Sequence, residues 1–455
     1  MRIAVVNWSR RRAGGVETYL GGVIPELLRA GHDVAFWHEA DVPSNRERIP
    51  LPEVVPAWSV EELGARGALA ALGAWRPDLI YAHGLLDPSL EEATLGVAPA
   101  VFFAHSYYGT CISGAKTFKR PVVRPCGRQF GWRCLALYYP RRCGGLSPVT
   151  MLREYRRQSA RFELLKRYRA IVTHSTHIKQ ELIGHGLSAS SAYKFPYYVH
   201  GHQERRAAGE EGDFVVVGEP TSLPGGRPLP HDEHDGTRPG AMSFPPLAEG
   251  AARHLLFLGR MDVLKGGGVL LDALPLAREA LGVPLRVTFA GDGPARRAWE
   301  RRAARLRGAH PDIAVEFTGW LDGTRIAALL AGCDLLVLPS LWPEPFGLVG
   351  PEAGLRGVPI AAFGVGGIPD WLSDGVNGRV APGDPPTAEG LAGAIADCLR
   401  DPATHARMRL AAIRLAQKYD MKNHLAALLD VFEHVLRRGD DAGHAGAGAG
   451  GVGRG

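Results

Sequence analysis

The sequence predicts an α/β protein with two doubly wound parallel sheets in tandem. Short apolar runs rich in Val, Ile, Leu and Phe alternate along the chain with longer stretches of helical periodicity. This alternation is typical of strands that helices cover on both faces. The chain is also 455 residues long, which is more than one hydrophobic core normally accommodates. Two folding units are therefore expected.

Each half of the chain supplies its own set of expected strands. In the first half they lie at 3–7, 33–37, 79–83, 100–105, 170–174 and 192–196. In the second half they lie at 254–259, 285–290, 314–317, 334–339 and 359–363. Because the runs are continuous rather than alternating, each set is expected to form one buried parallel sheet.

The segments between and after these strands set the expected domain boundaries. The expected division is a first domain at 1–205 with a basic, cysteine-rich insertion at 106–150, a flexible linker or insertion at 206–252, a second domain at 253–420, a terminal helix at 421–438 and a tail at 439–455. The linker is rich in Gly, Pro and charge, although 214–217 could add an edge strand. The amphipathic terminal helix could return to pack on the first domain, and the Gly-rich tail is expected to be disordered.

Composition narrows the class of protein and of partner. The chain is 45% hydrophobic and 22% charged, as globular proteins are, and no run reaches the roughly 18–20 apolar residues that span a bilayer. Arg10, Arg11 and Arg12 follow the first apolar run, the reverse of a signal peptide, so a cytoplasmic location is expected. The net charge of +6 favours acidic ligands, but no nucleic-acid-binding module is recognisable, and nucleic acid is not an expected partner.

Two carboxylates flank a Gly/Pro-rich turn after the expected strand at 334–339. Glu344 lies in the turn and Glu352 in the segment that follows it. Carboxylates can accept hydrogen bonds from several hydroxyls, and the backbone amides at residues 346–348 would face a bound anion. The motif therefore predicts a site for a sugar and a phosphate.

A pair of cations follows the first strand of the second half. Arg260 and Lys265 surround a Gly-rich helix start, which suits a diphosphate, although a solvated basic loop is the alternative. The order of these residues is not that of a P-loop, which argues against an ATPase. No Gly-x-Gly-x-x-Gly follows the first strand of the chain, which argues against a dehydrogenase. Gly291 and Gly319 end later strands and would let a flat base approach the backbone.

The first half offers a second phosphate-binding turn and two histidines. Gly14 and Gly15 precede a helix that begins with Val16 and Glu17, where free amides favour a phosphate, although a simple tight turn is the alternative. His83 and His105 follow neighbouring strands. A histidine there can contact a sugar hydroxyl or a phosphate and exchange a proton near neutral pH, although structural histidines are common at such positions.

The insertion after His105 carries four cysteines without any short paired spacing such as Cys-x-x-Cys. These are Cys111, Cys126, Cys134 and Cys143. A structural zinc site, unrelated reduced thiols and disulfides all remain open. Residues 106–153 contain no Asp or Glu but many Lys, Arg and aromatic residues. Such a segment suits a phosphate-bearing, lipid-linked acceptor and peripheral contact with anionic lipid at the inner face of the membrane; a solvated loop is the alternative.

Taken together, these motifs resemble the retaining glycosyltransferases of family four, which have the GT-B architecture of two Rossmann-like domains facing across a cleft. The matching residues are Gly14-Gly15 with Glu17, His105, Gly259-Arg260, Lys265-Gly266, Gly291 with Gly293, 334–340, Glu344-Pro-Phe-Gly347, Glu352, 366–369 and 374–378. The resemblance covers about residues 1–205 and 253–437. Asp370 departs from it, because the family more often carries Glu there.

The resemblance implies roles for several of the matched residues. Arg260 and Lys265 would bind the donor diphosphate, and Glu352 would bind the ribose hydroxyls. Glu344, with the amides of Phe346, Gly347 and Leu348, would bind the transferred sugar. Gly14 and Gly15 would approach the phosphate from the other domain, and His105 would contact the sugar near the reacting carbon.

The resemblance also implies the reaction. The donor would be a UDP- or GDP-linked sugar, and the acceptor a hydroxyl of a glycan, a glycolipid or another molecule. The anomeric configuration would be retained without a cofactor or a divalent metal, because cations and helix termini offset the charge of the leaving group. The alternatives are a nucleotide-sugar epimerase of the same architecture and a non-catalytic sugar-nucleotide binder or membrane-docked protein.

Overall fold

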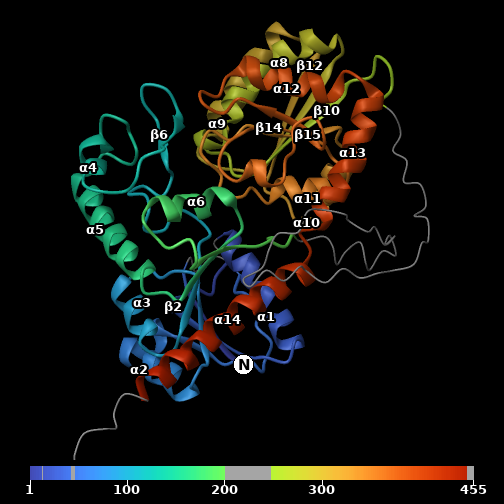
Figure 1. The fold of residues 1–455 in the computed structure, drawn as a ribbon. Coiled ribbons are helices and arrows are strands. Elements are labelled where there is room, and N and C mark those ends of the chain that lie inside the picture. The colour runs from blue at the N-terminus through green and yellow to red at the C-terminus, as the bar shows by residue number, and fades with distance from the viewer. Residues whose placement is uncertain (13, 43–46, 200–246, 448–455) are drawn as a thin grey trace, which may run out of the picture.

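The computed structural model describes residues 1–12, 14–42, 47–199 and 247–447. These residues form two parallel-sheet α/β bodies that lie side by side, each flanked by helices (Figure 1). The two expected sheets are confirmed. The expected linker, including 214–217, lies outside the described residues up to residue 246.

The first sheet has seven strands in the order β3-β2-β1-β4-β5-β8-β9, and every neighbouring pair is parallel. Its strands are β1 (Arg2–Ser9), β2 (Asp33–Ala40), β3 (Ala57–Ser59), β4 (Leu79–Ala82), β5 (Ala100–Phe103), β8 (Ala170–Thr173) and β9 (Ala192–Lys194). The central strands β4, β5 and β8 are buried at every residue, which explains why their sequences read as continuous apolar runs.

The second sheet has six parallel strands in the order β12-β11-β10-β13-β14-β15. Its strands are β10 (Arg253–Leu258), β11 (Leu285–Ala290), β12 (Ile313–Gly319), β13 (Leu335–Leu338), β14 (Ile360–Phe363) and β15 (Gly378–Ala381). The strand order reverses direction between β1 and β4 in the first sheet and between β10 and β13 in the second. Ligands of such sheets bind at the carboxyl ends of the strands near that point.

Helices connect the strands, and a small antiparallel hairpin stands apart from the two sheets. The hairpin is β6 (Thr117–Phe118) with β7 (Arg124–Pro125). The helices are α1 (Gly15–Arg29), α2 (Val60–Trp75), α3 (Pro88–Leu95), α4 (Arg133–Tyr138), α5 (Pro148–Leu165), α6 (Thr176–Gly184), η1 (Val263–Lys265), α8 (Gly267–Leu281), α9 (Arg296–Ala309), α10 (Gly323–Ala331), α11 (Val349–Leu355), η2 (Ile368–Asp370), α12 (Ala388–Leu399), α13 (Pro402–Gln417) and α14 (Met421–Ala447). Among the described residues, no helix is long and apolar enough to cross a bilayer.

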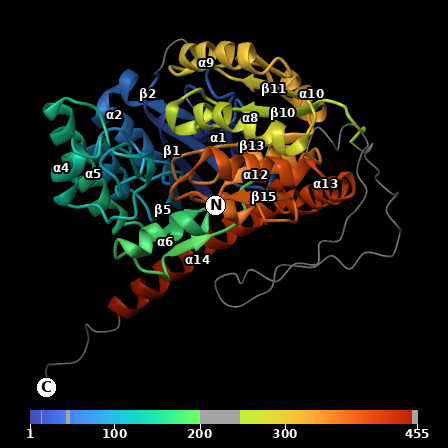
Figure 2. The same cartoon turned by 90° about the horizontal axis from the view of Figure 1, so that it is seen from above.

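The last helix, α14, leaves the second body and lies along the first, as both views show (Figures 1 and 2). Its His424 is fully buried there, with Nε2 2.8 Å from Tyr19 Oη and Nδ1 2.8 Å from the Pro196 carbonyl oxygen. Phe432 packs edge-on against Tyr81. The helix continues to Ala447, so the start of the tail expected to be disordered is helical instead, and residues 448–455 lie outside the described part.

Candidate functional site

Lys265 and Glu344 meet at the carboxyl end of the second sheet. Lys265 ends η1, and Glu344 lies in the loop between β13 and α11. Lys265 Nζ donates a hydrogen bond to Glu344 Oε1 at 2.5 Å, and Ser340 Oγ donates to the same oxygen at 2.7 Å. Glu344 is buried, and a buried carboxylate is tolerated where a cation and a hydroxyl satisfy it. Two residues that the sequence assigns to one site are therefore in direct contact.

A glycine explains how Lys265 comes to this position. Asp262 caps η1 by accepting the amide of Leu264, and Gly266 then turns the chain at a φ of +72°. A side chain at Gly266 would put Cβ 1.7 Å from the carbonyl oxygen of Pro339. Only glycine allows so close an approach at this φ, so the Gly-rich helix start that sequence reasoning noticed serves to bring Lys265 against the end of β13.

The backbone around Glu344 is held by a second glycine turn. Gly367 N donates to the Glu344 carbonyl oxygen at 2.7 Å. Gly366 has a φ of +61°, and a Cβ there would lie 2.1 Å from the same oxygen. Trp371 Nε1 donates to the carbonyl oxygen of Phe346 at 2.6 Å. Three groups from the segment after β14 therefore fix the loop that carries Glu344.

The amides that follow Glu344 point to no acceptor within the described part of the chain. Those of Phe346, Gly347 and Leu348 donate to none of the described backbone or side-chain acceptors. Gly347 has a φ of +87°, a conformation that glycine adopts without strain. Unsatisfied amides beside a helix start favour an anion or a polarised oxygen.

Glu352 lies on α11, one helix turn beyond these amides. Burial raises the pKa of its carboxyl group to about 7, and the nearby Arg356 opposes that shift. A carboxyl group with such a pKa accepts hydrogen bonds best at or above neutral pH, where it is ionised.

The turn between β1 and α1 is shaped by Glu17. Its Oε2 accepts the amide of Gly14 at 2.8 Å, and its Oε1 accepts the indole N–H of Trp8 at 3.0 Å and the Asn7 amide at 3.3 Å. A capping carboxylate of this kind orders the first turn of a helix. The Gly14–Gly15 turn therefore has a fixed shape, and a Cβ at Gly15 would meet no atom within 4 Å, so its backbone faces open space.

His83 and His105 form one hydrogen-bonded pair at the ends of β4 and β5. His83 Nδ1 lies 2.8 Å from His105 Nε2. Burial lowers the pKa of His83 to about 3 and holds the pKa of His105 well below its usual value, an effect that the neighbouring His83, His174 and His424 increase. Desolvation thus favours the neutral form of the His105 ring, and its exchange of a proton near neutral pH stays a prediction.

The remaining residues that the sequence assigns to the donor site lie around the ends of β10, β11 and β12. Arg260 is exposed just after β10. Gly291 and Gly319 face each other, with Gly291 N donating to the Gly319 carbonyl oxygen at 2.9 Å. A Cβ at Gly291 would lie 2.0 Å from the Gly259 carbonyl oxygen. The glycines thus allow three strand ends to approach closely.

Sequence reasoning missed the contacts that join the two bodies. Tyr107, just after β5, donates from Oη to the carbonyl oxygen of Pro343 at 2.6 Å. Asp370 accepts the amide of Thr176 at 2.8 Å and Lys194 Nζ at 2.6 Å. The signal for Asp370 was its acidic side chain at a Gly-rich helix start, but its partners lie almost two hundred residues away, and no local pattern identifies them.

The four cysteines of the insertion form no disulfide, and the zinc site that was one alternative is not confirmed. All four are free thiols, and Cys111 Sγ accepts the amide of Lys116 at 3.4 Å. Among the described residues, no group of three or more His, Cys, Asp or Glu side chains could hold a metal ion. Burial raises the pKa of Cys126 and Cys134, and that of Cys143 to about 12.

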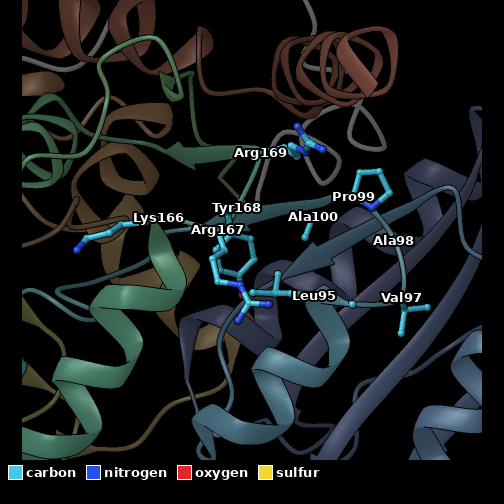
Figure 3. Close-up of a pocket in the computed structure, with 10 residues that line it drawn as sticks. Leu95, Val97, Ala98, Pro99, Ala100, Lys166, Arg167, Tyr168 and Arg169 are labelled. Atoms are coloured by element: carbon cyan, nitrogen blue, oxygen red, sulfur yellow. The ribbon is translucent and has the colours of Figure 1, made fainter. Parts of the chain in front are cut away.

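A pocket of about 640 Å³ lies at the amino ends of the strands of the first sheet (Figure 3). Residues 95–100 and 166–169 line it, where β5 and β8 begin. Arg167 in its wall pairs with Glu92, and Lys166 with Glu163. Ligands of parallel sheets bind at the carboxyl ends of the strands, so this pocket is not part of the candidate site.

Each half of the chain matches a family model of glycosyltransferases. A model described as Glycosyltransferase Family 4 matches residues 13–193, and one described as Glycosyl transferases group 1 matches residues 252–401. A glycogen synthase of Mycobacterium tuberculosis is 37% identical over 182 residues, 39% of this chain and 42% of that protein. A D-inositol 3-phosphate glycosyltransferase of Streptomyces avermitilis is 35% identical over 190 residues, 40% of each chain. The alignments thus span about two fifths of these relatives.

Solved structures match over nearly the whole length. The HepE protein of Anabaena, in complex with UDP and glucose, has a TM-score of 0.57 at 19% identity and covers 97% of this chain and 100% of its own. The sucrose-phosphate synthase of Thermosynechococcus elongatus has a TM-score of 0.60 at 18% identity, and the match covers 97% of this chain and 99% of that protein. The arrangement of two parallel-sheet domains is the GT-B fold.

Proposed function

Because the chain belongs to glycosyltransferase family 4, we propose that it transfers a hexose or related sugar from a UDP- or GDP-linked donor to a hydroxyl group of a glycan, glycolipid or other acceptor. The observation that carries this proposal is the contact between Lys265 and Glu344 beside three unsatisfied amides. A cation, a carboxylate and amide donors at one strand end match the diphosphate, the hydroxyls and the oxygen atoms of a nucleotide sugar.

The donor occupies the second domain in this proposal. Arg260 and Lys265 bind the diphosphate, and Glu352 accepts the ribose hydroxyls. Glu344, together with the amides of residues 346–348, binds the transferred sugar. The hydrogen bond from Lys265 orients the Glu344 carboxylate, so that it serves as an acceptor of hydroxyl hydrogens.

The first domain completes the site. Gly15 presents its backbone to the phosphate, next to the turn that Glu17 orders. His105 contacts the sugar near the reacting carbon, and because burial favours the neutral form of its ring it acts there as a hydrogen-bond partner. The leaving diphosphate is stabilised by Arg260 and Lys265 instead of a divalent metal, and the anomeric configuration is retained.

The experiment is a donor screen followed by product analysis. Thermal shifts with UDP, GDP and ADP identify the base, and UDP is the first to test because HepE was solved with it. Mass spectrometry then follows sugar transfer from the matching donor to glycan and glycolipid acceptors with and without EDTA, and NMR reads the anomeric configuration. An isomeric nucleotide sugar formed without acceptor would instead indicate an epimerase, and binding without any product a non-catalytic binder.

We also propose that the basic insertion docks on anionic lipid. Large apolar side chains are exposed over the β6–β7 hairpin, α4 and the start of α5, which gather at one end of the molecule (Figure 1). They are Val122, Trp132, Leu146, Val149 and Leu152, between 45% and 73% exposed. Exposed Lys and Arg side chains lie between them, and 106–153 contains no acid. Apolar side chains among cations fit the surface of an anionic bilayer.

Vesicle sedimentation tests this surface. The wild-type protein should bind phosphatidylglycerol vesicles, release them at high salt and ignore phosphatidylcholine vesicles. Trp132→Ser combined with Val149→Ser should weaken binding, whereas Val263→Ser, an exposed apolar site in the second domain, should not. Equal binding to both kinds of vesicle, or no effect of the double variant, would contradict the proposal.

A further inference from the structure

A hydrogen-bonded path joins the first domain to the loop that carries Glu344. Tyr107 is 1% exposed, and its Oη donates to the carbonyl oxygen of Pro343 at 2.6 Å. Nε2 of His177 lies 2.7 Å from the same Oη. Because the single phenolic hydrogen goes to Pro343, the network assigns a hydrogen to His177 Nε2, which donates it to Tyr107.

Packing fixes the ring of Tyr107 as well. It belongs to the core cluster of the first domain, and Trp342, from the loop of the second domain, packs against that cluster. The Tyr107 ring lies 6.4 Å from the ring of Trp342 and 5.8 Å from that of His177. The first domain therefore holds the two residues before Glu344 by one side chain and by one backbone carbonyl.

The first turn of α6 also contacts the second loop that shapes Glu344. Thr176 donates to Asp370 through both its amide and its hydroxyl. A Cβ at Gly367 would lie 2.8 Å from that of Ser175. Since Gly367 is bonded to the carbonyl oxygen of Glu344, the start of α6 meets both loops on which the position of Glu344 depends.

The basic insertion is anchored on the same helix. Lys116 is buried and forms an ion pair with Glu181 of α6. The amide of Phe130 donates to His185 Nε2 at 2.7 Å, just past the end of α6. The insertion, α6 and the loop of Glu344 thus form a continuous series of contacts across the two domains.

We propose that Tyr107, oriented by His177, is a positioning residue for the transfer reaction: it holds the Pro343–Glu344 peptide so that the Glu344 carboxylate meets the donor sugar in the reactive geometry. The inference rests on the proposed function. Without the Tyr107 hydroxyl, the cations and the ribose-binding carboxylate remain in place, but the Glu344 loop loses its cross-domain hydrogen bond. Turnover therefore depends on Tyr107 more strongly than nucleotide binding does.

Tyr107→Phe tests this, because the ring and its packing are kept and only the hydroxyl is lost. The expected result is a kcat lower by about tenfold, with the dissociation constant of the nucleotide within about twofold. Tyr108→Phe is the matched control, because that neighbouring hydroxyl bonds Glu91 inside the first domain. It should lower stability and leave kcat unchanged. His177→Gln, which keeps a donor, should retain more turnover than His177→Ala.

Hydrogen exchange gives a readout that needs no transfer reaction. The amide of Gly367, bonded to Glu344, should exchange about fivefold faster in Tyr107→Phe than in wild type, and at an unchanged rate in Tyr108→Phe. If wild type transfers no sugar but this difference is seen, the proposed function fails while the positioning contact stands. Unchanged exchange together with unchanged kcat in Tyr107→Phe, or equal losses of kcat in both tyrosine variants, would overturn the inference.

Discussion

Replacing Lys265 by alanine should separate the observed contact of its ammonium group with Glu344 from its proposed role in binding the donor diphosphate. It removes one of the two donors to Glu344 Oε1 and leaves Ser340 as the other. A hydrogen bond to a charged group is worth about 1.5–3 kcal/mol. The Lys265 side chain is 32% exposed and that of Glu344 is 9% exposed, so solvent screens part of this, and we expect a loss of about 1–2 kcal/mol in the free energy of unfolding.

The effect on turnover should be larger than this loss predicts. If Lys265 Nζ also offsets the charge of the leaving diphosphate, its removal should lower kcat by about 10²- to 10³-fold. Ser340→Ala is the matched control, because it removes the other donor to the same oxygen without removing a charge. It should cost a similar amount of stability and lower kcat by less than about tenfold.

The assay is urea unfolding together with steady-state kinetics of both variants at a saturating donor concentration. A kcat that falls equally in Lys265→Ala and Ser340→Ala would mean that Lys265 acts only by holding Glu344. A kcat unchanged in Lys265→Ala would refute the assignment of the donor diphosphate to this end of the sheet.

Three further predictions concern single residues around the same site. Burial raises the pKa of Glu352 from 4.5 to about 7. As pH rises, the unfolded chain therefore loses this proton before the folded protein does, and the protein should lose stability between about pH 4.5 and about pH 7. Glu352→Gln should reduce the Tm difference between pH 5 and pH 8, and the same Tm difference in the variant as in wild type would contradict the raised pKa. Gly366→Ala should lower the free energy of unfolding by at least about 1–3 kcal/mol, since a Cβ at that positive φ meets a backbone oxygen; no change in a urea titration would show that the turn can relax. Asp370→Ala should cost about 1–3 kcal/mol by removing three accepted hydrogen bonds, and its Thr176 amide should then exchange faster; full protection of that amide would show that Asp370 is not its acceptor.

The sheets were predictable because their strands are buried on both faces. β4, β5 and β8 do not alternate polar with apolar residues, so their apolar runs mark them directly. The edge strands β9 and β12 were also predicted, but the edge strands β3 and β15 were not. β3 has only three residues, and β15 contains Arg379 among small residues, so hydrophobicity does not distinguish either from a loop.

The proximity of Glu344 and Lys265 was predictable, but the geometry of the candidate site was not. Glu344 and Lys265 each follow a strand of one sheet, and the carboxyl ends of parallel strands lie together, so their proximity follows from topology. The bonds of Tyr107 and Asp370 depend on how one domain sits against the other, which no local pattern encodes. The lowered pKa of His105 depends on burial among other histidines, which sequence spacing does not show.

The path of α14 bears on how the protein is made. The first sheet is complete after Lys194, yet the buried side chains of Tyr19 and Tyr81 find their covering partners in His424 and Phe432. During synthesis, the ribosome delivers those partners only after the entire second domain has emerged. Until then the nascent first domain exposes an apolar, tyrosine-lined surface, which is the kind of surface that chaperones bind and that promotes aggregation. In a protein truncated before residue 421, the second domain should therefore stay in solution, whereas the first domain should need a chaperone to remain in solution.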